Sequence, residues 1–457
     1  MIYLILILGL GLRLISLNQS FWLDEATSAT VARDFNFSRI ITQFSPGDFH
    51  PPLYYLLLKI WTLPFGISEI SARSFSIVCA LLSIFLVYVL GRKLKDKSSG
   101  LMAAFLMAVS PLFIYFSQEA RMYALETLLV LIAVYLFIKF LNKTNLILAT
   151  GLFFTIAVLG LTDYLPLTIL PVFWLVAILS HKSQKWWIVF ISMHIIPILA
   201  FLWWSPILIR QLTAGLGVQT TSLAWWQVLG GNSLKELLLV PVKFMIGRIS
   251  FASKIIYGLV VIVTGILFVL PLVVIVKRIK TFKLVIVWLL LPLLLAYLVS
   301  FVVPVFSYFR LLFILPAFYL LISLGLSYFP AGAIRPYLIV LVILNVVFAM
   351  VYLTNSKFQR EDWRGMSDFI TQESLNKKAE VLFVSDGQME AYRYYNRSVS
   401  SFGPSGFNQA DDLVWLSRYV QPMFDPEDKL KQEIEDSGYK KLGEYNFNGV
   451  VVWKYEK

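Results

Sequence analysis

The sequence has little charge, one cysteine and few histidines. Only 14% of its 457 residues are charged and 58% are hydrophobic. Because soluble domains carry about 25% charged residues, a water-soluble globule is excluded. The lone Cys79 rules out an intrachain disulfide, and three scattered histidines argue against a zinc cluster. The chain also lacks a glycine-rich phosphate loop, a zinc-hydrolase motif and a serine nucleophile elbow, which argues against a nucleotide-driven pump and a soluble-type hydrolase.

Acidic residues are scarce until the last quarter of the chain. Residues 1–354 hold ten Asp and Glu residues, whereas residues 355–457 hold 17. This shift predicts a boundary near Thr354, where a membrane region ends and a polar domain of ordinary composition begins.

The polar tail, residues 355–457, has the patterning of a small α/β domain. Helical periodicity covers 363–374 and 428–437, and buried-strand patterns cover 381–385 and 450–455. We therefore expect a small C-terminal α/β domain attached to an α-helical membrane region.

Long apolar runs recur along residues 1–354, and each is long enough to cross a bilayer as a helix. They predict about 11 transmembrane helices, at 1–17, 70–91, 100–117, 121–141, 145–162, 164–180, 186–209, 255–276, 284–303, 310–328 and 336–354. We expect the first to stay uncleaved, because Arg13 interrupts it and no small-residue cleavage site follows. The tryptophan pairs at 203–204 and 225–226 are typical of bilayer interfaces. The chain is thus expected to be a polytopic membrane protein.

Basic residues indicate how these helices are oriented. Thirteen of them lie on alternate connections, with a single acid, Asp96. They are Arg92, Lys93, Lys95, Lys97, Lys139, Lys143, Lys182, Lys185, Lys277, Arg278, Lys280, Lys283 and Arg335. The positive-inside rule then predicts a plasma-membrane protein with a cytoplasmic N-terminus and an extracytoplasmic C-terminal domain. The net charge of +12 is explained by topology, so no nucleic-acid partner is expected.

The first outer loop, residues 18–69, is long and contains several acidic and polar residues that are suited to catalysis or substrate binding. It contains Asp24 and Glu25, then His50 to Tyr55 in the run HPPLYY, and finally Glu69. A carboxylate on an outer loop beside the membrane is suited to act as a general base. The structural alternative is that both acids cap or solvate a short interfacial helix.

Three further groups combine charge with an outer position. Arg73 lies where the chain re-enters the membrane, and it is suited either to bind a phosphate or to extend toward lipid headgroups. Glu119, Arg121 and Glu126 surround the second outer turn, where Arg121 can pair with either acid to hold two helices together. Arg310 lies at the outer mouth of the tenth predicted span. It is suited either to bind a charged substrate or to anchor the helix at the bilayer interface.

Taken in order, these segments resemble glycosyltransferase family 39 of the GT-C class, which includes the protein O-mannosyltransferases and the lipid A aminoarabinose transferase. The resemblance rests on WLDEA at 22–26, HPPLYY at 50–55, Glu69 with Arg73, SQEARMY at 117–123, Arg310 and DWR at 362–364. It covers essentially residues 1–365 and is strongest over 10–130. Tyr55 stands where the O-mannosyltransferases have Lys, so the chain is more similar to the bacterial and archaeal members whose acceptors are mostly undefined.

The resemblance implies an inverting transferase that takes a sugar from a polyprenyl-phosphate carrier and passes it to a lipid, protein or glycan acceptor at the outer membrane face. It implies Asp24 as catalytic base, with Glu25 beside it. The implied substrate-binding residues are His50, Tyr55, Arg73, Glu119, Arg121, Glu126 and Arg310. Glu126 occupies the position of a later family acid, as Glu rather than Asp.

The reaction needs positive charge beside the leaving phosphate, and this charge does not have to come from a metal ion. Because the leaving group is a phosphate monoester, arginines on the outer side are able to stabilise it, so we expect no cofactor and leave a divalent cation open. Two other classes remain in view: a transporter of polyprenyl-linked glycans, and a non-catalytic protein that binds lipid-linked sugar. A transporter predicts charges along a path through several helices, whereas these acids gather at one face.

Overall fold

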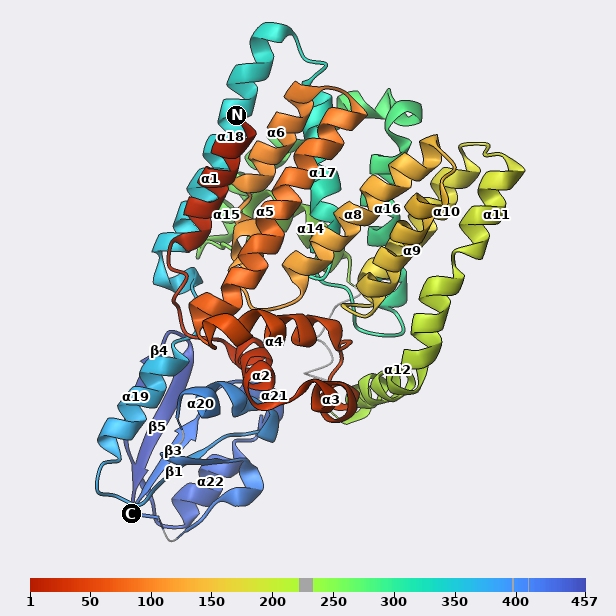
Figure 1. The fold of residues 1–457 in the computed structure, drawn as a ribbon. Coiled ribbons are helices and arrows are strands. Elements are labelled where there is room, and N and C mark those ends of the chain that lie inside the picture. The colour runs from red at the N-terminus through yellow and green to blue at the C-terminus, as the bar shows by residue number, and fades with distance from the viewer. Residues whose placement is uncertain (222–232, 397, 410) are drawn as a thin grey trace.

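The computed structural model describes residues 1–221, 233–396, 398–409 and 411–457. A bundle of helices carries a mixed sheet domain at one end, and the N-terminus lies near the opposite end of the bundle (Figure 1). Of the predicted interface tryptophans, Trp203 is exposed and Trp204 is buried. Trp225 and Trp226 lie outside the described residues.

The helices fall into a bundle and a first outer loop. The bundle contains α1 (Ile2–Leu14), α5 (Glu69–Leu94), α6 (Lys97–Ala108), α7 (Pro111–Ser117), α8 (Tyr123–Asn142), α9 (Leu146–Gly160), α10 (Ile169–Ile178), α11 (Gln184–Ser192), α12 (Ile195–Thr221), α14 (Leu234–Ile246), α15 (Lys254–Val276), α16 (Ile279–Val299), α17 (Leu315–Leu326) and α18 (Ala331–Thr354). The first outer loop forms α2 (Leu23–Asp34), α3 (Phe37–Arg39) and α4 (Leu53–Phe65).

The predicted helical membrane fold is confirmed. Six helices of the described chain are long and apolar enough to cross a membrane, or seven if α6 and α7 form one span bent by 62°. The bend has a local cause, since Pro111 begins α7 and the Ser110 hydroxyl caps it by accepting the Phe113 N–H. The four other predicted spans overlap the shorter apolar helices α1, α9, α10 and α17.

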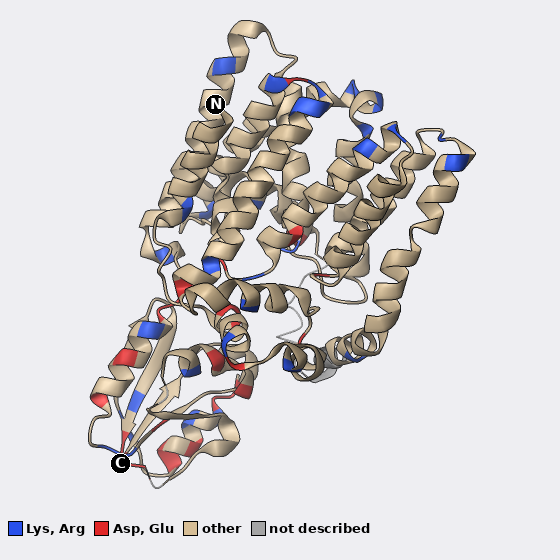
Figure 2. Ribbon diagram, in the orientation of Figure 1, with Lys and Arg blue, Asp and Glu red and all other residues tan. Residues whose placement is uncertain are grey.

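The predicted inner connections meet at one end of the bundle. Lys182 donates to the Leu141 carbonyl at 2.8 Å, and Lys283 donates to the Leu179 carbonyl at 2.7 Å. Lys95 and Arg278 both lie over the Tyr328 ring. Figure 2 shows basic residues gathered at this end, whereas most acids lie at the other end and in the sheet domain. The N-terminus and the C-terminal domain therefore lie at opposite ends of the bundle.

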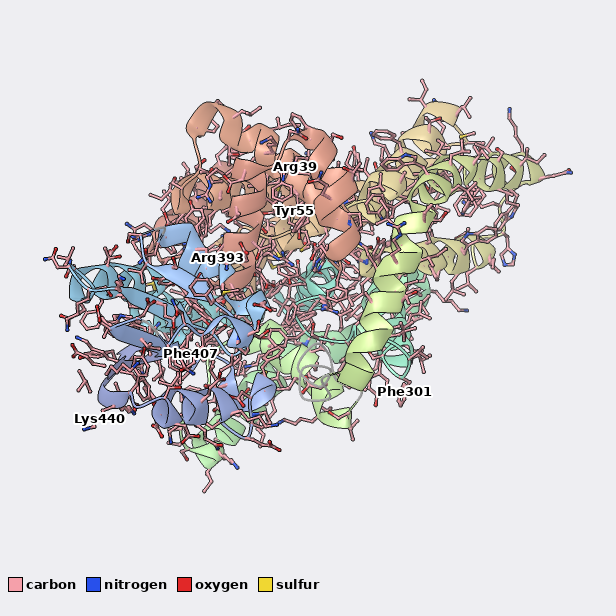
Figure 3. The ribbon with its side chains drawn as sticks, turned by 90° about the horizontal axis from the view of Figure 1, so that it is seen from below. Arg39, Tyr55, Phe301, Arg393, Phe407 and Lys440 are labelled. Carbon is pink, nitrogen blue, oxygen red and sulfur yellow. The ribbon has the colours of Figure 1, made fainter. Side chains whose placement is uncertain are left out.

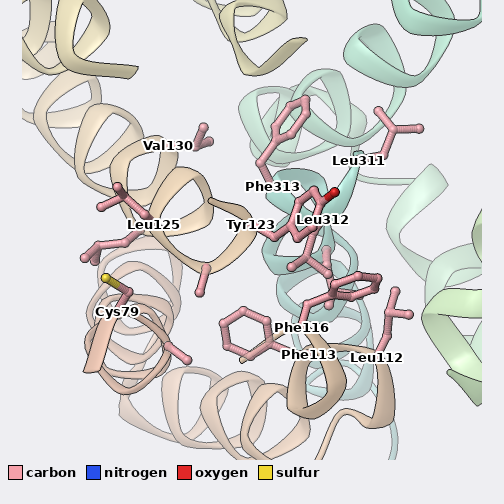
Figure 4. Packing of buried hydrophobic residues seen from close by; sticks show 14 of the residues in the cluster. Cys79, Leu112, Phe113, Phe116, Tyr123, Leu125, Val130, Leu311, Leu312 and Phe313 are labelled. Carbon is pink, nitrogen blue, oxygen red and sulfur yellow. The ribbon is translucent and has the colours of Figure 1, made fainter. Parts of the chain in front are cut away.

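Aromatic packing holds α7 and α8 against the chain before α17. The Phe116 ring lies 5.1 Å from Tyr123 and 6.0 Å from Phe309, and Tyr123 lies 5.6 Å from Phe309. Leu312 and Phe313 continue this core toward α8 (Figure 4). The two contacts of Tyr123 are edge-to-face, and aromatic contacts at these separations add to the stability that burial gives, so the ends of these helices next to the first outer loop are firmly placed.

The C-terminal domain is a five-stranded sheet in the order β2-β1-β3-β5-β4. Its elements are α19 (Trp363–Glu373), β1 (Ala379–Leu382), α20 (Glu390–Tyr395), β2 (Ser400–Phe402), β3 (Leu413–Ser417), α21 (Gln421–Phe424), α22 (Lys429–Asp436), β4 (Lys440–Phe447) and β5 (Val450–Glu456). Strand β1 is parallel to β2 and β3, and β5 is antiparallel to β3 and β4. The predicted α/β class is confirmed.

The C-terminal domain docks on the first outer loop. The Ser20 hydroxyl donates to the Glu361 carbonyl at 2.6 Å and accepts the Trp363 N–H at 3.0 Å. The Phe21 N–H donates to the Tyr395 hydroxyl at 2.7 Å. Seen from below, α20, which carries Arg393, lies beside the first outer loop (Figure 3). The loop is therefore held between the bundle and the sheet domain.

Candidate active site

Two adjacent carboxylates in the first turn of α2 lie in opposite environments. The Asp24 side chain is 42% exposed, whereas that of Glu25 is completely buried. Successive residues of a helix point about 100° apart, so a single turn directs one toward solvent and the other into the protein. Acids are also favoured in the first turn by the helix dipole. The expected Asp-Glu pair is thus divided into an accessible and an enclosed carboxylate.

Glu25 is the centre of a buried ion-pair network. Arg73 contacts both carboxylate oxygens, with Nε 2.8 Å from Oε1 and Nη2 2.6 Å from Oε2. The Ala120 N–H donates to Oε1 at 2.8 Å, and Nε of Arg360 lies 3.0 Å from Oε2. Burial alone raises the pKa of Glu25, but Arg360 and Arg73 outweigh it and hold this pKa below its usual value.

Arg73 has no N–H left for a substrate. Besides its two bonds to Glu25, it donates to the carbonyls of Leu17, Gln19 and Ser20 at 2.7, 2.6 and 3.1 Å. These five bonds use all five guanidinium donors. The geometry therefore contradicts Arg73 as a phosphate ligand and equally contradicts an arginine extended toward headgroups. Arg73 instead ties the start of the first outer loop to Glu25.

Arg121 contacts three residues that lie far apart in the first outer loop, Asp24, His50 and Tyr55. Its Nη2 lies 3.7 Å from Oδ2 of Asp24 and 3.4 Å from Nδ1 of His50, and its Nη1 donates to the Tyr55 hydroxyl at 3.2 Å. The Arg121 side chain is 4% exposed. Arg121 thus pairs with Asp24, and not with Glu119 or Glu126 as the sequence suggested.

Asp48 completes this group, although the sequence did not single it out. Its Oδ2 accepts the Tyr55 hydroxyl at 2.7 Å and lies 3.5 Å from Nδ1 of His50. Burial alone would raise the pKa of Asp48. The combined effect of His50, Arg121 and Tyr55 is larger and lowers this pKa to about 2. The only sequence signal was its place two residues before the HPPLYY run. Tyr55 is itself fully buried, so its hydroxyl serves to hold Asp48 and Arg121.

Arg360 is the main residue that sequence reasoning missed. It lies between α18 and α19, outside the motifs, yet it reaches back to Glu25 and places Nη2 3.1 Å from Oε2 of Glu119. Its guanidinium also lies 4.7 Å from the Tyr115 ring centre. Burial raises the pKa of Glu119 to about 7, against the lowering effect of Arg360.

Glu126 and Arg310 form a separate group on the bundle side. Glu126 is buried, its Oε1 has no hydrogen-bond partner among the described residues, and it interacts electrostatically with Asp163 and Arg310. Arg310 is half-buried and donates to the Pro304 carbonyl at 3.2 Å. Tyr123 lies within the electrostatic reach of both Arg310 and Asp24. The predicted residues therefore divide into a group at Asp24 and a group at Glu126, with Tyr123 between them.

Arg248 is a second missed cation. Gly247 ends α14 with φ +69°, and a Cβ there would lie 2.9 Å from the Cβ of Pro111, so only glycine allows this close approach to α7. The turn places Arg248 against Tyr115, to which it donates a hydrogen bond, with the guanidinium 4.4 Å from the ring centre. Arg248 remains exposed. Tyr115 thus lies between Arg248 and Arg360.

The described residues contain no group of three or more His, Cys, Asp or Glu side chains that could hold a metal ion. The charged groups at the site are instead carboxylates matched with arginines. An arginine is able to stabilise phosphate charge through forked hydrogen bonds.

Comparisons with known proteins give a family pattern and a fold. Residues 49–209 match the family model of dolichyl-phosphate-mannose-protein mannosyltransferase. No curated protein sequence matches the chain. Among solved structures, ArnT from Cupriavidus metallidurans bound to undecaprenyl phosphate has a TM-score of 0.59 at 11% identity, covering 99% of this chain and 97% of ArnT.

Two larger proteins are also similar. AglB from Archaeoglobus fulgidus, an archaeal oligosaccharyltransferase in complex with an inhibitory peptide and a dolichol-phosphate, has a TM-score of 0.53 at 11% identity, covering 99% of this chain and 73% of AglB. The arabinofuranosyltransferase AftD from Mycobacteria has a TM-score of 0.52 at 13% identity, covering 100% of this chain and 41% of AftD. The chain therefore has the fold of the GT-C membrane glycosyltransferases, and its resemblance to glycosyltransferase family 39 is confirmed by the mannosyltransferase pattern over residues 49–209.

Proposed function

We propose that this protein is an inverting glycosyltransferase that moves a sugar from a polyprenyl-phosphate carrier to an acceptor hydroxyl at the outer membrane face. The observation that carries the proposal is the half-exposed Asp24 carboxylate, held beside Arg121 on a loop that Glu25 locks in place. The mannosyltransferase pattern and the similar folds of ArnT with undecaprenyl phosphate and AglB with dolichol-phosphate support it.

In this proposal Asp24 is the general base. It accepts the proton of the acceptor hydroxyl while the hydroxyl oxygen bonds to the anomeric carbon. The bond from that carbon to the phosphate oxygen breaks on the opposite side, so the configuration inverts and polyprenyl phosphate leaves with the bonding electrons. Arg121 at 3.7 Å keeps Asp24 oriented, and the carboxylate acts through its position more than through high basicity.

Exposed cations are needed for the leaving phosphate. Arg248 and Arg310 both keep solvent-accessible surface, and Arg121 is buried beside Asp24. We assign the donor phosphate to Arg248 and Arg310, because a guanidinium stabilises the developing dianion through charge-assisted bonds. Arg73 is reassigned from substrate binding to loop positioning, since all its donors are used within the protein.

The remaining predicted residues take two roles in this proposal. Glu25, Tyr55 and Glu119 are positioning residues, because each is buried and bonded to another site residue. His50, which is partly exposed, and Glu126, which has an unpartnered oxygen, are the candidates for contacts with sugar or acceptor hydroxyls.

The proposal places the Asp24 end of the bundle and the C-terminal domain outside the cell membrane. The basic connections at the opposite end support this orientation through the positive-inside rule. The lipid-linked donor would then reach the site from the outer leaflet of the bilayer. The reaction would belong to the glycosylation of a lipid, a protein or a glycan.

A direct test follows the donor. Membranes containing the protein are supplied with a synthetic polyprenyl-phosphate sugar that is labelled in the sugar, and both polyprenyl phosphate release and labelled product are measured. A transferase releases polyprenyl phosphate in step with product. A transporter moves the intact donor and releases none, and a non-catalytic binder retains it. Either of these two results contradicts the proposal. Mass analysis of glycolipids and glycoproteins from cells with and without the protein then identifies the acceptor.

A further inference from the structure

We infer that Arg360, in the linker between the last membrane helix and the C-terminal domain, is a positioning residue that couples docking of this domain to the placement of Asp24. The inference rests on the proposed function, in which Asp24 is the base. It concerns a residue outside every motif of the sequence.

The first step of the coupling is the contact between the linker and the first outer loop. Arg360 places Nε 3.0 Å from Oε2 of Glu25 and Nη2 3.1 Å from Oε2 of Glu119. Its backbone N–H donates to Oε1 of Gln19 at 2.9 Å. One side chain therefore bridges α2 to the turn before α8, and its backbone holds the entry to the loop.

The second step links this contact to Asp24 and Arg121. Glu25 immediately follows Asp24, and its Oε1 accepts the N–H of Ala120, the residue before Arg121. Glu25 therefore joins the backbone of the base to the backbone of its ion-pair partner. A shift of Glu25 changes both members of the Asp24–Arg121 pair together.

The third step leads into the C-terminal domain. Asn448, in the turn between β4 and β5, donates its two side-chain amide hydrogens to the carbonyls of Arg360 and Ser356 at 2.7 and 3.0 Å, and the same nitrogen lies 3.5 Å from the Gln359 carbonyl. Asn448 has φ +50°, a conformation that asparagine adopts more readily than most residues. The hairpin turn thus fixes the linker that carries Arg360.

These contacts form one continuous path from the β4–β5 turn to the base. Arg360 is almost fully buried, and its guanidinium also lies 4.7 Å from the Tyr115 ring centre. The surrounding side chains therefore restrict its guanidinium to this position. Buried charges are costly unless they are paired, and Glu25 and Glu119 are the carboxylates that pair with this guanidinium. The C-terminal domain therefore contributes to the site without supplying a reacting group.

The test compares variants at the two ends of this path in full-length protein. Arg360→Gln removes the charge, Arg360→Lys keeps it without the fork, and Asn448→Gly removes the amide while tolerating the positive φ. The control is Arg418→Gln, which breaks an ion pair with Asp428 inside the C-terminal domain.

We expect Arg360→Gln to lower kcat about 10- to 100-fold, the effect of misplacing a catalytic group by a fraction of an ångström to 1 Å, with the donor KM changed less than about twofold. Arg360→Lys should recover part of the rate, Asn448→Gly should show a smaller loss of kcat, and Arg418→Gln should leave kcat unchanged. Equal losses in Arg360→Gln and Arg418→Gln, or a change confined to KM, would overturn the inference.

An independent measurement separates this inference from the proposed function. Hydrogen exchange of residues 23–34 and 118–122 should be faster in Arg360→Gln and Asn448→Gly than in the unmodified protein, and unchanged in Arg418→Gln. If the unmodified protein transfers no sugar while exchange changes as expected, the proposed function fails and the coupling holds. Unchanged exchange in both linker variants removes the coupling. If Arg360→Gln does not fold, Asn448→Gly alone decides in the same way.

Discussion

Glu25 and Arg73 form a forked ion pair across 48 positions of sequence, with oxygen–nitrogen distances of 2.8 and 2.6 Å, and neither side chain is more than 1% exposed. A buried pair of this kind costs desolvation when it forms, so its value lies in specifying one arrangement as much as in stability. Here the arrangement that it specifies is the first turn of α2, which carries Asp24.

Removing one partner should destabilise the protein. Arg73→Met leaves the Glu25 carboxylate buried with half of its cationic neighbours and leaves three backbone carbonyls without a donor. We expect a loss of about 3–5 kcal/mol, because breaking a buried pair strands a charge. Arg33→Met, which breaks the partly exposed pair with Asp34, should cost less than about 1 kcal/mol. Thermal unfolding in detergent measures both, and equal shifts would contradict the account.

Arg248 should govern the affinity for the donor. If it binds the donor phosphate, Arg248→Gln removes a charge-assisted contact and should raise the donor KM about 10- to 100-fold. Lys254→Gln is the matched control, because Lys254 is an exposed cation at the start of α15. Steady-state rates at varied donor concentration measure the effect. An unchanged KM for Arg248→Gln would assign the phosphate to other residues.

Glu119 should make stability depend on pH near neutrality. Burial raises the pKa of Glu119 to about 7, above its usual value of 4.5. Its contribution to stability is thus fully present below pH 4.5 and is lost as the pH rises through about 7. Relative to Glu119→Gln, the unmodified protein should lose stability between pH 4.5 and 7 and then level off.

The measurement is the difference between the unfolding temperatures of the two proteins at pH 5 and pH 8. Arg360, Glu25, Arg248 and Arg121 are the charged groups that act on Glu119, and they are present in both proteins. Glu380 of the C-terminal domain also has a pKa raised to about 7 by burial, but it cancels in the comparison. A difference that does not change with pH would show that Glu119 does not titrate in this range.

The orientation can be tested by cysteine labelling, because the chain has one cysteine, Cys79, and it is buried. In a Cys79→Ser background, single cysteines replace exposed Lys280 on the basic side and exposed Lys457 in the C-terminal domain. A membrane-impermeant maleimide on intact cells should label Lys457→Cys and leave Lys280→Cys unlabelled until the cells are opened. The reverse pattern would place the proposed site in the cytoplasm.

Hydropathy and charge were sufficient to predict the membrane fold and the small C-terminal α/β domain. Each predicted span overlaps a helix because burial in lipid imposes a long apolar run whatever the tertiary packing is. The lengths of the spans were harder to predict from the sequence. One apolar run contains both α6 and α7, which are separated at Ser110-Pro111, and hydropathy does not detect a bend of this kind.

The site was predicted only in part. The motifs singled out Asp24, Glu25, His50, Tyr55 and Arg121 through their order along the chain and its resemblance to a family pattern, because acidic and polar residues on a loop are common and carry little signal one by one. Sequence patterns could not assign partners, so Arg73 was expected at a phosphate although it is bonded to Glu25 and loop carbonyls. Arg360 was missed because its role comes entirely from the return of the linker to the first loop, a contact with no local signature.

The central claim is that Asp24 is the base of a sugar transfer, and it is tested most directly by Asp24→Asn in membranes with labelled donor. We expect transfer to fall about 10²- to 10⁴-fold, the usual contribution of a general base, with protein level and donor binding unchanged. Asp34→Asn, on the same helix, should transfer at the normal rate. Normal transfer by Asp24→Asn would contradict the account.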